Sequence, residues 1–194
     1  MRVLLLFCHP VEDSYNAALR QVARAALERA GHLVDDCDLY AEGFEPVLSR
    51  RERIDYHDPA INRAPVAGYV ARLLAAEALV LCFPVWNFGL PALLKGFFDR
   101  VFLPGVSFDL TDDGRVRPRL QHVRKLAAIA TYGCSRPVAW YVGDPPRRFC
   151  TRALRRQVRP GARIVYLAQY RMNVSTEATL ARFLARVERA MARF

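Results

Sequence analysis

Short apolar runs separated by segments with helical periodicity are the feature that most constrains the fold of this chain. There are five such runs, and they are rich in Val, Leu, Ile and Ala, which is typical of strands buried on both sides. Segments with one apolar face lie between them. This alternation predicts a parallel sheet with helices on both faces. We expect the strands at residues 3–8, 32–38, 78–82, 126–131 and 164–168.

The intervening segments complete this pattern. Helices are expected at residues 14–30, 65–76, 92–102, 144–158 and 175–191, while residues 39–62 are polar and irregular. Residues 106–118 contain the turn signal Asp112-Asp113-Gly114, with the alternating segment 106–110 before it and Val116 after it, and predict a small hairpin. A chain of 194 residues is long enough for one buried core. We therefore expect a single domain that spans residues 1–194.

The turn after the first strand decides between two strand orders. It reads CHPVEDSYN from Cys8 to Asn16 and contains no glycine, so the G-x-G-x-x-G signature of a Rossmann site is missing. This favours a flavodoxin-like, three-layer α/β/α fold with strand order 2-1-3-4-5. In that order the loops after strands one and three flank a crevice at the carboxyl edge of the sheet, where ligands bind.

The loop after the third strand is the most distinctive part of the chain. Residues 83–91 read FPVWNFGLP, and Leu93, Leu94, Phe97, Phe98, Val101 and Phe102 form one stripe on the helix that follows. The rings of Trp86 and Phe88 beside the Asn87 amide suit a flat heterocycle with polar edges, such as a flavin. The alternative interpretation is an aromatic loop that closes the end of the core.

The other two loops at this edge give weaker signals. Ser14, Tyr15 and Asn16 open the first helix, whose free N–H groups suit a phosphate, and His9 could add a donor. The alternative is an ordinary helix cap, and the two acids before Ser14 disfavour a phosphate unless they face solvent. The loop at residues 131–133 could offer N–H groups to the pyrimidine edge of a flavin, or serve as a simple turn.

Composition excludes several classes of protein. The net charge of +10 comes almost entirely from scattered arginines, and no Lys/Arg block predicts a nucleic-acid partner. The five cysteines are widely spaced, which disfavours a disulfide framework, and no spacing of His and Cys predicts a metal site. No apolar segment is long enough to insert into a membrane. These features favour a reducing, cytoplasmic location.

Several of these segments resemble a known family. The resemblance is carried by His9, residues 14–16, the segment 38–49, the run FPVWNFGLPALLKGFFDRVF at 83–102 and residues 131–133. These segments are similar to the NAD(P)H:quinone oxidoreductases of the DT-diaphorase type. Trp86-Asn87-Phe88 also resembles the flavin-contacting loop of FMN-dependent azoreductases. The resemblance covers most of residues 1–135. It implies a flavodoxin-like homodimer that holds FMN or FAD, takes a hydride from NAD(P)H and passes it to a quinone-like acceptor.

The resemblance also implies roles for individual residues. The flavin phosphate would be held by His9, Ser14, Tyr15 and Asn16; the isoalloxazine would be bordered by Pro84, Val85, Trp86, Asn87, Phe88 and Gly89; and its far edge would meet Thr131, Tyr132 and Gly133. The Tyr/His pair that assists charge relay in the mammalian-type enzymes has no match at 134–138, so no catalytic residue is predicted. The longer C-terminal region of those enzymes is missing too, which leaves FMN and FAD both open.

Two other functions compete with this one. A flavin-bound regulatory subunit, resembling the ancillary proteins of potassium-efflux membrane systems, would use the arginine-rich face at residues 147–159, although such a face is more often merely solvated. A one-electron carrier like flavodoxin is disfavoured, because such carriers are usually acidic.

Overall fold

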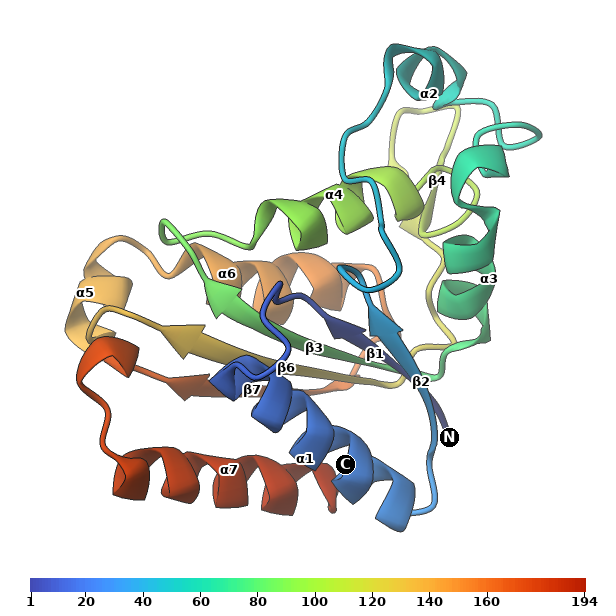
Figure 1. Cartoon of the computed structure of the whole chain (residues 1–194). Coiled ribbons are helices and arrows are strands. Elements are labelled where there is room, and N and C mark those ends of the chain that lie inside the picture. Colours follow the sequence, from blue (N-terminus) through green and yellow to red (C-terminus); the bar gives the residue numbers. More distant parts are fainter.

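A parallel sheet of five strands forms the centre of the computed structural model, which describes residues 1–194 (Figure 1). The strand order is β2-β1-β3-β6-β7. With the main strands counted along the chain this is the predicted order 2-1-3-4-5, so the predicted flavodoxin-like fold is confirmed. The strands are β1 (Arg2–Phe7), β2 (Leu33–Asp38), β3 (Ala78–Val85), β6 (Lys125–Tyr132) and β7 (Arg163–Gln169).

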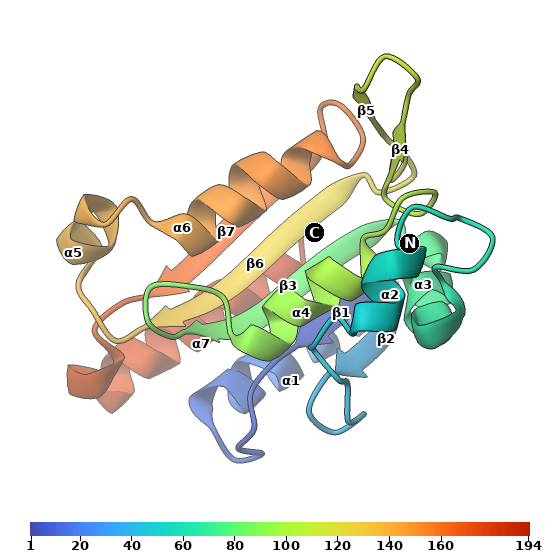
Figure 2. The ribbon, with the colours of Figure 1, turned by 90° about the horizontal axis from the view of Figure 1, so that it is seen from above.

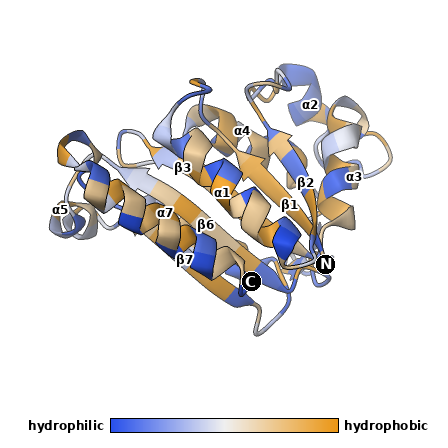
Figure 3. Cartoon of the chain, turned by 60° about the horizontal axis from the view of Figure 1, so that its bottom comes forward, coloured by the Kyte–Doolittle hydropathy of each residue, from blue (hydrophilic) through white to orange (hydrophobic).

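Helices cover both faces of the sheet because successive strand residues point to opposite sides. Val3 and Leu5 of β1 pack toward α1 (Tyr15–Arg29) and α7 (Glu177–Met191), while Leu4 and Leu6 pack toward the other layer. Figure 3 shows α1 and α7 side by side on one face of the sheet. The opposite layer contains α3 (Ala67–Ala75), α4 (Ala92–Val101) and the segment that begins with α6 (Pro145–Arg148) (Figures 1 and 2).

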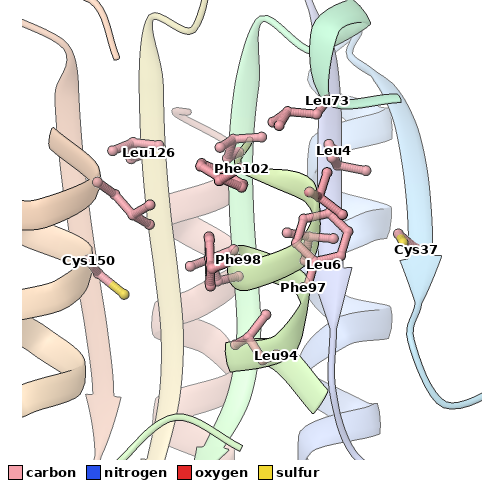
Figure 4. Close-up of a cluster of buried hydrophobic side chains, with 14 of the residues drawn as sticks. Leu4, Leu6, Cys37, Leu73, Leu94, Phe97, Phe98, Phe102, Leu126 and Cys150 are labelled. Carbon is pink, nitrogen blue, oxygen red and sulfur yellow. The ribbon is translucent and has the colours of Figure 1, made fainter. Parts of the chain in front are cut away.

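Helix α4 packs unusually closely on the chain that follows β2. Leu94, Phe97 and Phe98 fill the core beneath it (Figure 4). At Gly96 a methyl group would lie within 2.5 Å of the Cα, Cβ and carbonyl oxygen of Pro46, so only a glycine fits there. One turn further on, Arg100 bonds the carboxylate of Glu52, with Nη2 at 2.6 Å from Oε1. Only 10% and 11% of these two side chains are exposed, so α4 carries a buried ion pair.

Several elements differ from the expectation. Strand β3 continues through Pro84 to Val85 and stays paired with β6. A proline is tolerated there because β1 pairs with β3 only as far as Cys82, so the missing N–H of Pro84 interrupts no pairing with β1. The irregular stretch contains a short helix, α2 (Arg50–Asp55), that begins at a capping box between Ser49 and Glu52. A second short helix, α5 (Arg136–Tyr141), was not expected.

The helix predicted at 144–158 is not one regular α-helix. It divides into α6, a π turn at Phe149–Ala153 and a 3-10 turn at Leu154–Arg156. Cys150, Leu154 and Val158 are buried as predicted, but Ala153 is exposed, because the wide turn shifts the phase of the apolar stripe. The predicted hairpin is confirmed as β4 (Phe108–Leu110) paired with β5 (Val116–Pro118).

Strand β2 forms one edge of the sheet and carries acids on both faces. Asp36 accepts hydrogen bonds from Arg20 at 2.8 Å and Arg24 at 3.2 Å on the α1 side. On the opposite face Arg72 bonds Asp35 at 2.7 Å. The edge is therefore lined with ion pairs.

No helix of the molecule combines the length and the hydrophobicity that crossing a membrane requires.

Candidate functional site

A cavity of about 300 Å³ opens at the carboxyl edge of the sheet, between the loops that follow β1, β3, β6 and β7. This is the edge at which a doubly wound sheet binds ligands. The loops converge there because the carboxyl ends of parallel strands lie side by side. Nine of the residues proposed from the sequence line it: His9, Ser14, Tyr15, Asn16, Pro84, Val85, Trp86, Thr131 and Gly133.

The first loop presents backbone donors at the start of α1. The Ser14 hydroxyl accepts from the N–H of Ala17 at 3.2 Å, so the helix-cap interpretation holds for this side chain. The N–H groups of Tyr15 and Asn16 meet no backbone acceptor. The Tyr15 hydroxyl turns away and donates to the carbonyl of Leu180 at 2.8 Å. This loop therefore offers N–H groups to an anion, and the phenol serves to hold α7.

Acidic side chains do not line this cavity. Glu12, which argued against a phosphate, lines a separate hollow next to β2. Asp13 lines neither of the two hollows. The negative charges of Glu12 and Asp13 therefore do not argue against a phosphate in this cavity. Its lining consists of neutral polar and apolar groups together with His9.

A buried hydrogen bond joins the first loop to the end of β6. The Asn16 side chain donates from Nδ2 to the Thr131 hydroxyl at 2.9 Å, and both residues are almost fully buried. The Cys82 thiol contacts the Asn16 carbonyl at 3.6 Å. Asn16 thus fixes the floor of the cavity, and its amide reaches a neighbouring strand instead of the open space.

The loop after β3 holds a tight turn in a strained conformation. Asn87 and Phe88 have φ angles of 47° and 59°, and the Gly89 N–H bonds the Trp86 carbonyl at 2.9 Å, as in a type I′ hairpin turn. Left-handed backbone at two residues other than glycine is unusual and is concentrated at functional sites. Trp86 is 43% exposed, and its ring centroid lies 5.9 Å from that of His9. Asn87, Phe88 and Gly89 shape the turn but do not line the cavity.

Tyr132 points away from the cavity. Its side chain is buried in the opposite layer, where its hydroxyl donates to Asp144 at 2.7 Å and lies 2.5 Å from the hydroxyl of Tyr166. Burial, reinforced by these neighbours, raises the pKa of Tyr132 far above its usual value. The phenol therefore stays protonated, and only the backbone of Tyr132 lies near the site.

The sequence reasoning missed a fourth contributor. Met172 and Asn173 line the cavity from η4 (Met172–Val174), the 3-10 turn that follows β7. The Asn173 amide lies close to Gly133, and Arg171 donates its N–H to the Cys134 carbonyl at 3.0 Å. The position of Met172 and Asn173 directly after β7 could have predicted this contribution, because the loops that follow the parallel strands of one sheet meet at the same edge.

Comparison with known proteins identifies the family of this chain. A family model described as "Flavodoxin-like fold" matches residues 1–148. The chain belongs to this flavodoxin-like family. NAD(P)H dehydrogenase (quinone) 1 of Rattus norvegicus is 30% identical over 148 residues, which cover 68% of this chain and 54% of the rat protein. The chain spans about half the length of the first curated relatives it matches, with shares of 54%, 45% and 47%.

Solved structures of this flavodoxin-like type superpose over nearly the whole chain. An NAD(P)H:quinone oxidoreductase from Methanothermobacter marburgensis has a TM-score of 0.85 at 23% identity and covers 99% of this chain and 98% of its own. An FMN-dependent NADH-azoreductase from Bacillus anthracis, solved with FMN, has a TM-score of 0.79 at 15% identity with the same coverage of 99% and 98%. At these identities the likeness concerns the fold. The family match and these superpositions together confirm the resemblance predicted from the sequence.

Proposed function

We propose that this flavodoxin-like protein is a flavin-dependent oxidoreductase that takes a hydride from NAD(P)H and passes it, through bound FMN or FAD, to a quinone-like acceptor. The observation that carries the proposal is one cavity that joins the free N–H groups of α1 to a half-exposed Trp86 ring. Relatives named for NAD(P)H and quinones, and a structural neighbour named for FMN, support it.

The donors at α1 fit a phosphate. The N–H groups of Tyr15 and Asn16 lie at the positive end of a helix of 15 residues, and no backbone carbonyl satisfies them. His9 lies beside them. Its Nδ1 bonds the backbone of Val11 at 3.1 Å, which leaves Nε2 available as a further donor. In our proposal these groups hold the flavin phosphate.

The remaining lining fits a planar ring with a polar edge. Trp86 offers a flat apolar surface, and Pro84 and Val85 add rigid backbone beside it. The N–H of Gly133 meets no backbone acceptor and could bond the ring edge. A volume of about 300 Å³ is at the lower end of the range for ligand sites.

The flavin, when bound, would supply the capacity to accept and release a hydride. The chain's own residues would bind and orient it. The Asn16–Thr131 hydrogen bond keeps two of the loops at a fixed separation. The turn at Asn87 and Phe88 holds Trp86 beside the cavity. We assign no acid–base residue. The expected homodimer and cytoplasmic location stay predictions, and sedimentation analysis tests the first.

The direct test identifies the cofactor. The full chain is purified, any yellow chromophore is released by heat and identified by chromatography, and NADH and NADPH are then assayed with a quinone such as menadione. We expect bound FMN or FAD and ping-pong kinetics with the quinone. A colourless protein that takes up neither added flavin would refute the proposal.

A pair of tryptophan variants locates the site. The chain has two tryptophans, Trp86 in the cavity and Trp140 outside it. Trp86→Ala should raise the flavin Kd about tenfold or more, because the loss of an aromatic contact and its buried area is worth over 1 kcal/mol. Trp140→Ala is the matched control and should leave the Kd for FMN, which has no adenine, unchanged, because Trp140 does not line the cavity. Equal Kd values for both variants in a flavin fluorescence titration would place the flavin elsewhere.

A further inference from the structure

Another hollow, of about 280 Å³, lies next to the cavity on the side away from β2 and is rich in arginine. We call it the arginine pocket. The residues that define it are Arg136, Trp140, Asp144, Arg147, Arg148 and Arg152. They come from α5 and from the segment that begins with α6, which lie beside the carboxyl ends of β6 and β7 (Figure 2).

The local fold explains why these side chains gather. Arg136 and Trp140 are four residues apart in α5, and Arg148 and Arg152 are four apart in the next helical segment, so each pair shares a face. Gly143, with a φ of 88°, makes the bend between the two segments. The bend turns the two faces toward one hollow.

The pocket carries positive charge that the protein does not neutralise. Asp144 is its one carboxylate, and it already accepts bonds from Tyr132 at 2.7 Å and from Arg147 at 3.1 Å. Arg136, Arg148 and Arg152 form no ion pair, in contrast to Arg20, Arg72 and Arg100 elsewhere in the molecule. Guanidinium groups in a concave site attract anions and bind phosphate in a bidentate way.

The two hollows are close enough for one ligand. Gly133 lines the cavity and Arg136 lines the arginine pocket, only three residues along the chain. Three residues span at most about 11 Å between Cα atoms. On the loop after β7, Tyr170 of the pocket and Asn173 of the cavity have the same separation in sequence. An extended dinucleotide would reach from one hollow to the other.

We propose that the arginine pocket binds the adenosine 2′-phosphate end of NADPH and makes this protein select NADPH over NADH. This inference rests on the proposed function, which requires a nicotinamide donor at the cavity. Arg148 and Arg152 hold the 2′-phosphate, the group that NADH lacks. Trp140, whose side chain is 77% exposed at the rim, offers a stacking surface for the adenine.

Binding is tested without turnover. Adenosine 2′,5′-bisphosphate and adenosine 5′-monophosphate are titrated into the purified full chain by calorimetry. We expect the bisphosphate to bind about tenfold tighter or more, and Arg148→Gln/Arg152→Gln to abolish the difference. Both arginines are exposed and unpaired, so this variant should fold, which circular dichroism checks. Arg155→Gln is the matched control, because Arg155 is exposed on the same segment but outside the pocket.

Kinetics separates this inference from the proposed function. With a quinone acceptor, Arg148→Gln/Arg152→Gln should lower kcat/KM for NADPH about 10- to 100-fold and leave that for NADH unchanged. A flavoenzyme that uses both donors equally, before and after the substitutions, would overturn the arginine pocket and leave the proposed function intact. A protein that binds the bisphosphate through these arginines but takes up no flavin would support the pocket and refute the oxidoreductase.

Discussion

Replacing Gly96 by alanine should destabilise this protein, although the same change in the middle of a helix usually stabilises. Alanine gains about 1 kcal/mol over glycine in a helix interior. At Gly96 the added methyl group would lie within 2.5 Å of three atoms of Pro46, two of them backbone. A backbone cannot rotate aside as a side chain does, so α4 or the chain at Pro46 has to move.

The magnitude follows from these opposing terms. Overpacking of this kind costs about 3 kcal/mol, at the upper end of the usual range, because the methyl group overlaps backbone atoms. Subtracting the gain in helix propensity leaves a net loss of about 2 kcal/mol. For a chain of 194 residues this corresponds to a fall in Tm of about 4–8 °C.

The assay is urea unfolding of the wild type and two glycine variants, followed by circular dichroism. Gly68 of α3 is the matched control, because a methyl group there meets no atom within 4 Å. We expect Gly68→Ala to gain up to about 1 kcal/mol, while Gly96→Ala loses about 2 kcal/mol. Equal or greater stability of Gly96→Ala would show that the packing of α4 on Pro46 is looser than described.

Three further predictions concern two buried polar contacts. Arg100→Met leaves the Glu52 carboxylate without its partner and should lose about 3–5 kcal/mol in urea unfolding, most of which Arg100→Met/Glu52→Leu should recover. Burial acts to raise the pKa of Glu52, but hydrogen bonds from Ser49 and Arg100 outweigh it and hold the pKa below the ordinary 4.5. The stability this gives is present above pH 4.5 and is lost as the pH falls, so Glu52→Gln should show a weaker loss in acid. Thr131→Val should lose about 1–2 kcal/mol, and a double-mutant cycle with Asn16→Leu that shows no coupling would contradict the hydrogen bond between them.

Fold class and strand order could be predicted from the sequence because they depend on residues that act independently of one another. The apolar runs predict buried strands, and a glycine-free turn after β1 disfavours the Rossmann order. Short helices were harder to predict. Helix α2 has a capping-box signal at Ser49 and Glu52 that was present in the sequence, but its one apolar residue, Ile54, is exposed, so the helix shows no apolar stripe.

The candidate site was predicted in position and less well in side-chain direction. Alternation along β6 places Thr131 on the α1 side and Tyr132 on the opposite side, so the two side chains cannot face one cavity. Asn16 was expected to reach a ligand, but its amide bonds Thr131 across 115 positions of sequence. Such a tertiary contact depends on two distant segments meeting, which local patterns do not reveal. Whether these residues bind a flavin stays a prediction.

The ion-paired edge at β2 limits how copies of this chain can associate. An incoming strand that continued the sheet there would lay its side chains over the bonds of Arg20 and Arg72 to Asp36 and Asp35, and would strip water from charges already arranged for solvent. Growth of the sheet from one molecule into the next is therefore blocked on that side. A homodimer of this protein should therefore not form by strand pairing at β2, and fibres should not grow through that edge of the sheet.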